Sequence, residues 1–180
     1  NHSFFSSNKY IHTFKQMLES LINHYCVFFQ DHKLDYGWVE GIQKNKLIIV
    51  PLQGKIIFLP ENRVTFSWRG KKLPLNAVQA HETIGQHLKQ AEQYKQAFEL
   101  ETMHSLLENG REYSLDELAF DFLDDPKNSV YQLGLFLALR EDSFWFKHNR
   151  NLTYTPRTSA ELELLQVQLV RQHERRKRVV

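Results

Sequence analysis

Apolar side chains near the start of the chain recur every three to four residues, which is the spacing of one face of an α-helix. The residues that share this spacing are Ile11, Phe14, Leu18, Leu21, Ile22 and Tyr25. The pattern predicts a helix over residues 8–23, within an N-terminal helical segment that occupies residues 1–23.

Between residues 25 and 68, short runs of β-branched and aromatic residues alternate with turn-forming residues. These runs predict five strands, over residues 25–29, 36–42, 46–51, 55–59 and 63–68. Gly37 and Gly41 within one run indicate a bulge or a sharp bend. Five short strands joined by tight turns are typical of a small SH3-like barrel, which we expect over residues 24–69.

After residue 70 the helical spacing returns. A basic connector and a helix over residues 78–94 form the segment 70–96. Further helices are predicted over residues 97–109, 115–122 and 128–140, followed by a β-hairpin between residues 143 and 155. Three helices followed by a hairpin are the order of a winged helix-turn-helix domain, expected over residues 97–157.

Two capping signals support these helix boundaries. Ser114 and Glu117 form a capping box at the start of the short helix. Thr158 begins a last helix that, with its basic tail, fills residues 158–180. The expected fold is therefore α+β: a small SH3-like five-stranded β-barrel followed by a helical winged helix-turn-helix domain.

The composition is that of a folded chain, because 42% of its 180 residues are apolar and 13% are aromatic. The lone Cys26 excludes an internal disulfide and any Cys-based zinc site, and it fits a reducing compartment. No apolar run approaches the ~20 residues that span a bilayer, and residues 1–5 lack the pattern of a secretory signal. We expect a cytoplasmic protein with no membrane partner.

The formal charge of +2 is unevenly distributed: residues 171–180 carry +4 and residues 1–170 carry −2. The mildly acidic body argues against a protein that grips nucleic acid over its whole surface. The basic tail has two interpretations. It is either a solvated helix end, since cations suit a helix C-terminus, or a phosphate-contacting or linker helix.

The usual catalytic motifs are absent from the sequence. His81 and Glu82 begin like a metalloprotease helix, but Gly85 stands where the second zinc-binding His is required. Cys26 lies in an apolar run and is predicted to be a buried, inert thiol. The small acidic cluster of Asp121, Asp124 and Asp125 is interpreted as an exposed helix end. We therefore predict no catalytic residue, no metal ligand and no cofactor in this chain.

Nucleic-acid contact is the chemistry that the barrel could offer. Trp38, Phe58, Phe66 and Trp68 are interpreted either as core or as stacking faces for single-stranded bases. The residues predicted to contact RNA are Trp38, Lys44, Lys46, Arg63, Arg69, Lys71 and Lys72, with Arg175, Arg176, Lys177 and Arg178 in the tail.

The predicted third helix of the winged-helix segment, residues 128–140, is apolar on nearly every side. A helix that reads DNA needs Arg, Lys, Asn or Gln projecting from one face into the major groove, and Gln132 is the only such residue in its middle. We expect this helix to be buried between its neighbours. The sequence thus disfavours a sequence-specific transcription factor.

This order of parts resembles the region ahead of the catalytic domain in ribonuclease II/ribonuclease R (RNB) family exoribonucleases whose cold-shock domains are replaced by other modules. The resemblance covers residues 24–178. In the barrel it lies in residues 37–41 (Gly-Trp-Val-Glu-Gly) and 46–63. In the second half it lies in residues 106–107 (Leu-Leu), 113–118 (Tyr-Ser-Leu-Asp-Glu-Leu), 135–142, 144–147 (Phe-Trp-Phe-Lys), 154–157 (Tyr-Thr-Pro-Arg) and 160–178.

The resemblance implies an accessory, non-catalytic region of a processive 3′→5′ exoribonuclease that guides RNA or binds a partner. In that family a separate catalytic domain holds Mg²⁺ on clustered Asp residues. This chain departs from that pattern, because no Asp occurs between Asp125 and Asp142. The implied partners are RNA, bound weakly and without sequence specificity, and the remainder of the parent polypeptide.

The alternative is a free-standing adaptor with SH3-like and winged-helix parts. It would bind a protein partner through the apolar face of the last helix, or nucleic acid.

Overall fold

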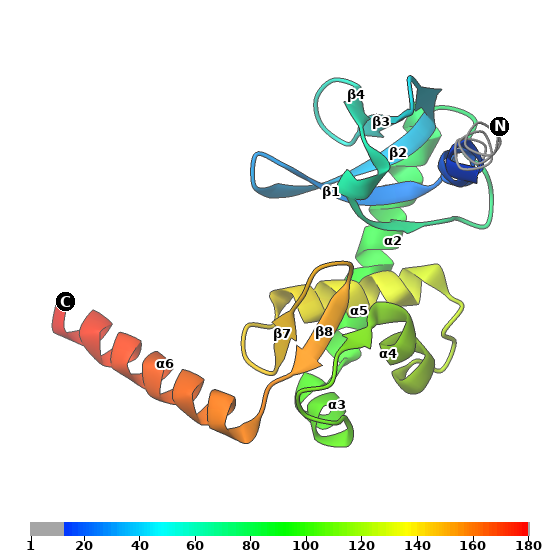
Figure 1. Cartoon of the computed structure of the whole chain (residues 1–180). Coiled ribbons are helices and arrows are strands. Elements are labelled where there is room, and N and C mark those ends of the chain that lie inside the picture. The colour runs from blue at the N-terminus through cyan, green and yellow to red at the C-terminus, as the bar shows by residue number, and fades with distance from the viewer. Residues whose placement is uncertain (1–12, 180) are drawn as a thin grey trace, which may run out of the picture. The chain divides into compact units, whose positions relative to one another are not determined.

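The computed structural model describes residues 13–179 and divides the chain into two compact units, residues 1–89 and 90–180. The long helix α2 (Ala77–Ala97) belongs to both, and each unit is described by itself (Figure 1). The expected mixture of α and β structure is confirmed. No helix among residues 13–179 is both long and apolar enough to cross a lipid bilayer.

The first unit contains a helical stretch over residues 13–20 and a five-stranded antiparallel sheet. The part of the predicted N-terminal helix before residue 13 lies outside the described residues. The strands are β1 (Tyr25–Gln30), β2 (Lys33–Gln43), β3 (Lys46–Pro51), β4 (Ile57–Leu59) and β5 (Val64–Trp68). Each lies within a few residues of its predicted position, because alternating apolar residues and turn residues mark strands locally.

The sheet order is β4-β3-β2-β1-β5, so β4 and β5 are its two edges. The 3₁₀-helix η1 (Glu61–Arg63) joins these edge strands. The hydrogen bonds between the described strands do not close the sheet into a barrel. The register between β2 and β3 shifts between Val39 and Gly41, which confirms the bulge predicted from the glycines.

One face of the sheet forms an apolar core. Its buried members are Leu18, Cys26, Phe28, Val39, Leu47 and Ile49. Gly37 allows this close packing, since a Cβ atom there would lie 2.6 Å from the Ile49 Cγ2 atom and 3.0 Å from the Val50 carbonyl oxygen. The sequence therefore needs glycine at this point of β2 because strand and side chain approach too closely for any other residue.

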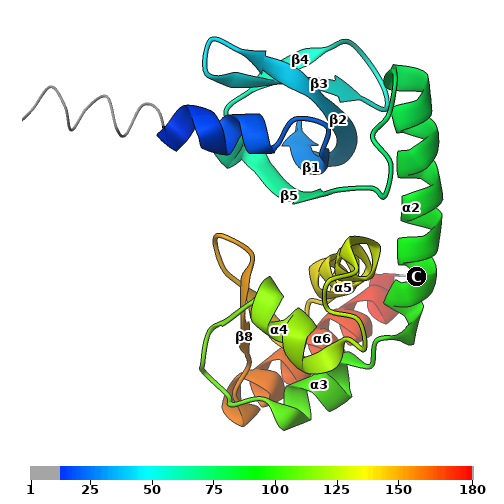
Figure 2. The same ribbon diagram turned by 90° about the vertical axis from the view of Figure 1, so that its right-hand side faces the viewer.

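The opposite face is aromatic and is covered by the first turns of α2. Tyr25 pairs with Trp38 on one side and with Trp68 on the other. The Trp68 Nε1–H donates a hydrogen bond of 2.9 Å to the His87 Nδ1 atom, and the Tyr25 and His87 rings lie 5.7 Å apart. Ala80 and Ile84 of α2 are fully buried. Helix α2 lies beside the sheet in both views (Figures 1 and 2).

The second unit contains α3 (Leu100–Leu106), β6 (Tyr113–Ser114), α4 (Leu115–Phe122), α5 (Ser129–Glu141), β7 (Phe146–His148), β8 (Thr153–Pro156) and α6 (Ser159–Val179). Its small sheet has the order β6-β8-β7. The Glu117 amide donates to Ser114 Oγ at 3.1 Å, as the capping signal predicted. The Glu117 carboxylate instead faces Arg111, at 3.7 Å.

Helix α5 is the centre of the second core. Seven of its residues are buried, namely Val130, Leu133, Gly134, Leu135, Phe136, Ala138 and Leu139. This burial confirms the prediction made from its apolar sequence. Gly134 lies directly against α2, because a Cβ atom there would stand 2.8 Å from Tyr94 Cβ and 2.9 Å from the Ala91 carbonyl oxygen.

Replacing Gly85 or Gly134, which both lie in helices, by alanine should change the free energy of unfolding in opposite directions. Alanine is favoured over glycine within a helix by ~1 kcal/mol, and Gly85 in α2 has no atom within 4 Å of its added Cβ. We expect Gly85→Ala to raise the free energy of unfolding by about 0.5–1 kcal/mol. Gly134→Ala should lower it, since Cβ would meet backbone and a Cβ atom that cannot move aside. Urea unfolding of both variants measures the two signs, and a stabilised Gly134→Ala protein would contradict this packing.

The hydrogen bond between Trp68 and His87 should make folding sensitive to pH. Burial lowers the pKa of His87 below its usual 6.5, so the unfolded chain takes up this proton first as the pH falls. The stabilisation is therefore complete well above pH ~6.5 and is lost as the pH decreases through the folded-state pKa. We expect His87→Gln, which keeps an acceptor but does not titrate, to flatten this dependence between about pH 7.5 and about pH 5 in urea unfolding.

His24 provides the comparison for that experiment. Its pKa is also lowered, by burial and then by the charge of Arg69, but it makes no hydrogen bond to Trp68, which bonds to His87. His24→Gln should remove only the contribution of His24 to the pH dependence of the free energy of unfolding, and the contribution of His87 should remain. Identical pH profiles for wild type and His87→Gln would show that His87 titrates alike in both states.

Candidate nucleic-acid interface

A hollow of about 430 Å³ lies where the β1–β2 turn approaches β4 and η1. Its lining residues are Phe29, Gln30, Asp31, Ile57, Phe58, Leu59 and Arg63. A second hollow of about 400 Å³ shares Phe29, Asp31 and Arg63 with it and adds His32. We call the two together the Phe29–Phe58 hollow, and it is the site where aromatic and basic side chains of the first unit come together.

Local sequence explains how this hollow is built. Asp31 and His32 have φ angles of 50° and 63°, and they connect Gln30 directly to its partner Lys33. A two-residue turn with both φ angles positive matches the natural twist of a hairpin, and Asp tolerates this conformation. Arg63 is fixed from the other side, since its amide donates to the Pro60 carbonyl oxygen at 3.0 Å and closes η1.

The two phenylalanines are unusually accessible for rings in a sheet. Phe29 is 41% exposed and Phe58 is 50% exposed. Side chains alternate between faces along a strand, so Phe28 enters the core while Phe29 points away from it. Exposed aromatic rings next to a guanidinium group are the elements of single-strand binding: bases stack on the rings and a phosphate contacts the cation. The Asp31 carboxylate could accept hydrogen bonds from the amino groups of bases.

Trp38 does not share this position. Its side chain is only 7% exposed, and in the sheet it stands opposite Tyr25 on the aromatic face. Phe66 and Trp68 are buried as well. Of the four aromatic residues considered from sequence, the structure therefore leaves only Phe58 accessible for stacking, and the other three belong to the core.

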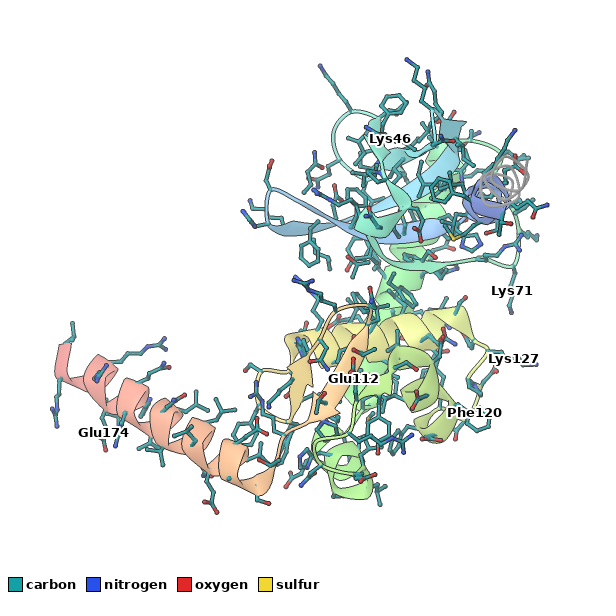
Figure 3. The ribbon with its side chains drawn as sticks, in the orientation of Figure 1. Lys46, Lys71, Glu112, Phe120, Lys127 and Glu174 are labelled. Atoms are coloured by element: carbon teal, nitrogen blue, oxygen red, sulfur yellow. The ribbon has the colours of Figure 1, made fainter. Side chains whose placement is uncertain are left out.

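The predicted basic residues of the first unit lie in three separate places. Lys44 and Lys46 are exposed at the tip of the β2–β3 hairpin, and Arg63 precedes β5. Arg69, Lys71 and Lys72 follow β5 and are also exposed. Figure 3 shows Lys46 and Lys71 well apart on this unit. Only Arg63 joins the Phe29–Phe58 hollow, so the structure does not gather these residues into one patch.

The tail residues Arg175, Arg176, Lys177 and Arg178 are exposed in the last turns of α6. They belong to the second unit. Both interpretations of the basic tail remain predictions, because exposure suits a solvated helix end and a phosphate contact equally.

Phe29 is the residue that sequence reasoning missed. It stands inside an apolar run, Tyr25-Cys-Val-Phe-Phe, that predicts a buried strand over its whole length. The available signal was its place at the end of the strand, next to the turn at Asp31, because Tyr25 and Val27 share its face and are buried.

The chemistry of the other candidates follows from their surroundings. Burial raises the pKa of Cys26 to about 12, so its thiol is protonated at neutral pH and is a poor nucleophile. Asp121, Asp124 and Asp125 are exposed. Within residues 13–179, no group of three or more His, Cys, Asp or Glu side chains is arranged to hold a metal ion.

Comparison of the chain with protein-family models, with curated proteins and with solved structures finds no match in any of the three.

Proposed function

We propose that this chain is an accessory, non-catalytic region that binds single-stranded RNA weakly within an RNB-family, ribonuclease II-like 3′→5′ exoribonuclease. The observation that supports RNA binding is the Phe29–Phe58 hollow, which is lined by two half-exposed rings and by Arg63. The family assignment rests on the sequence resemblance described above. Any Mg²⁺ for catalysis would belong to a separate domain.

The order of strands and helices supports an SH3-like module in the first unit and a winged-helix module in the second. Five antiparallel strands in the order β4-β3-β2-β1-β5, with a 3₁₀-helix before the last, are the arrangement expected of an SH3-like module. In the second unit, α3, β6, α4, α5, β7 and β8 follow one another, and the sheet order is β6-β8-β7. This succession supports a winged-helix unit whose third helix is part of the core and does not read a duplex.

Helix α6 favours a second function, that of a protein-binding adaptor. None of its 21 residues is buried, although Leu164, Val167, Leu169 and Val170 are apolar and about half exposed or more. An adaptor that uses this helix would bind a protein partner without needing RNA. We also propose a cytoplasmic location, which is compatible with RNA binding and with the adaptor function.

Binding of a fluorescent, unstructured RNA oligonucleotide tests the hollow. Stacking on an aromatic ring is worth ~1–3 kcal/mol per base, so we expect Phe58→Ala to weaken binding about 5- to 150-fold. Phe14→Ala is the matched control, because it removes a phenylalanine of similar exposure, 41% against 50%, that does not line the hollow. Arg63→Glu should also weaken binding, whereas Lys127→Glu, an exposed charge reversal elsewhere, should have little effect.

A different pattern would relocate the interface. If Lys71→Glu/Lys72→Glu abolishes RNA affinity while Phe58→Ala and Arg63→Glu leave it intact, the connector binds RNA and the hollow does not. If the wild-type chain has no affinity even at low salt, where phosphate contacts are strongest, the RNA-binding proposal is wrong and the adaptor remains.

The family assignment has its own test. We expect the polypeptide in its native cells to have a mass several times 21.5 kDa, with Asp-rich sequence in peptides that follow Val180. Mass spectrometry of the intact protein and of its C-terminal peptides measures both. A native mass near that of this chain would contradict the exoribonuclease assignment and leave RNA binding by the hollow unaffected.

A further inference from the structure

Helix α4 presents an acidic and apolar surface that the proposed RNA binding does not use. Six carboxylates and no basic residue occur between residues 112 and 125. The outer side of the helix borders a hollow of about 550 Å³ lined by Arg111, Tyr113, Asp116, Glu117, Phe120 and Asp121. Phe120 is 75% exposed (Figure 3). We call this surface the Phe120 hollow.

The Phe120 hollow has an excess of negative charge that its single cation does not offset. Arg111 already lies 4.7 Å from the centre of the Tyr113 ring and 3.7 Å from the Glu117 carboxylate. Asp116 and Asp121 are exposed and line the hollow together with Phe120. Such a surface repels phosphate and favours a ligand that combines an apolar contact with several cations.

Helix α6 carries a stripe with that combination. Positions spaced by three or four residues share one side of a helix, and the residues Leu164, Val167, Arg171, Arg175 and Arg178 follow one another at these intervals. All five are exposed. We call them the arginine stripe: its first part is apolar and its second part carries three guanidinium groups.

We propose that the arginine stripe of one copy of this chain docks in the Phe120 hollow of a second copy. Leu164 and Val167 would cover the exposed Phe120 ring, while the arginines would pair with Asp116 and Asp121. Two features support a second copy as the occupant. The charges are complementary, and α6 is a long helix with no buried residue in its own unit, whereas most helices are stabilised by packing an apolar face. This proposal is independent of RNA binding by the first unit.

One helix stripe in one hollow makes a small interface, and small polar interfaces are weak and transient. We therefore expect association at protein concentrations of about 0.1–0.5 mM in about 50 mM salt, and dissociation in about 500 mM salt, where charges are screened within a few ångströms. Analytical ultracentrifugation should show a mass above 21.5 kDa that rises with protein concentration at low salt only.

Charge reversal on and off the stripe separates docking from general electrostatic attraction. Arg171→Glu/Arg175→Glu should abolish association, raising the dissociation constant at least about tenfold. Arg176→Glu/Lys177→Glu makes the same change in net charge on other sides of the helix and should leave association largely intact. Equal loss in both variants would overturn the proposal. Phe120→Ser, which adds no charge, should also weaken association.

Mixing two differently changed chains gives the most direct test. Asp116→Lys/Asp121→Lys alone should be monomeric, because its hollow then repels its own stripe. Mixed with Arg171→Glu/Arg175→Glu, it should associate again, since each hollow then meets a stripe of opposite charge. Failure of the mixture to associate, with both variants folded by circular dichroism, would overturn the proposal. So would a wild-type chain that is monomeric at low salt and uses the stripe only to bind RNA.

Discussion

Helix α2 is the constraint on which both units depend, because it supplies one face to each core. In its first half Ile84 is fully buried, and at its middle His87 accepts the Trp68 hydrogen bond. Near its end, Ala91 and Tyr94 meet Gly134 of α5 so closely that only glycine fits there. A substitution in α2 at these contacts therefore affects a core, while Gly85, next to Ile84, faces open space.

Because α2 packs against the sheet in the first unit and against α5 in the second, only other surfaces of each unit remain exposed for binding. Tyr25 of β1 and Trp68 of β5 pack against His87 of α2, and Trp38 of β2 is buried. Phe29 and Phe58, at the end of the sheet, are about half exposed. In the second unit, most of α5 is buried, so it offers little surface for binding. What stays outside is α4, with its carboxylates around Phe120, and α6, with its arginines.

The Phe29–Phe58 hollow and the Phe120 hollow differ in charge, and we therefore propose a different kind of ligand for each. The Phe29–Phe58 hollow joins aromatic rings to a guanidinium group, which is the chemistry of single-stranded nucleic acid. The Phe120 hollow joins an aromatic ring to carboxylates, which is the chemistry of a basic protein segment. A chain with both could hold RNA in one unit and a second protein chain in the other.

The sequence by itself determined the elements: five strands with a bulge at Gly41, the capped helices and the buried α5. Those signals are local, since period, turn residues and caps act within a few positions. Only the tertiary structure decided which apolar residues became accessible. Phe28 and Phe29 are identical and adjacent, and Trp38 and Phe58 are both strand aromatics. Phe28 packs into the apolar core on one face of the sheet, whereas Phe29 lies at the end of β1. Trp38 is buried in a central strand, whereas Phe58 lies on the edge strand β4. The contacts that bury one ring of each pair join residues far apart in the chain, so no short stretch of sequence predicts them.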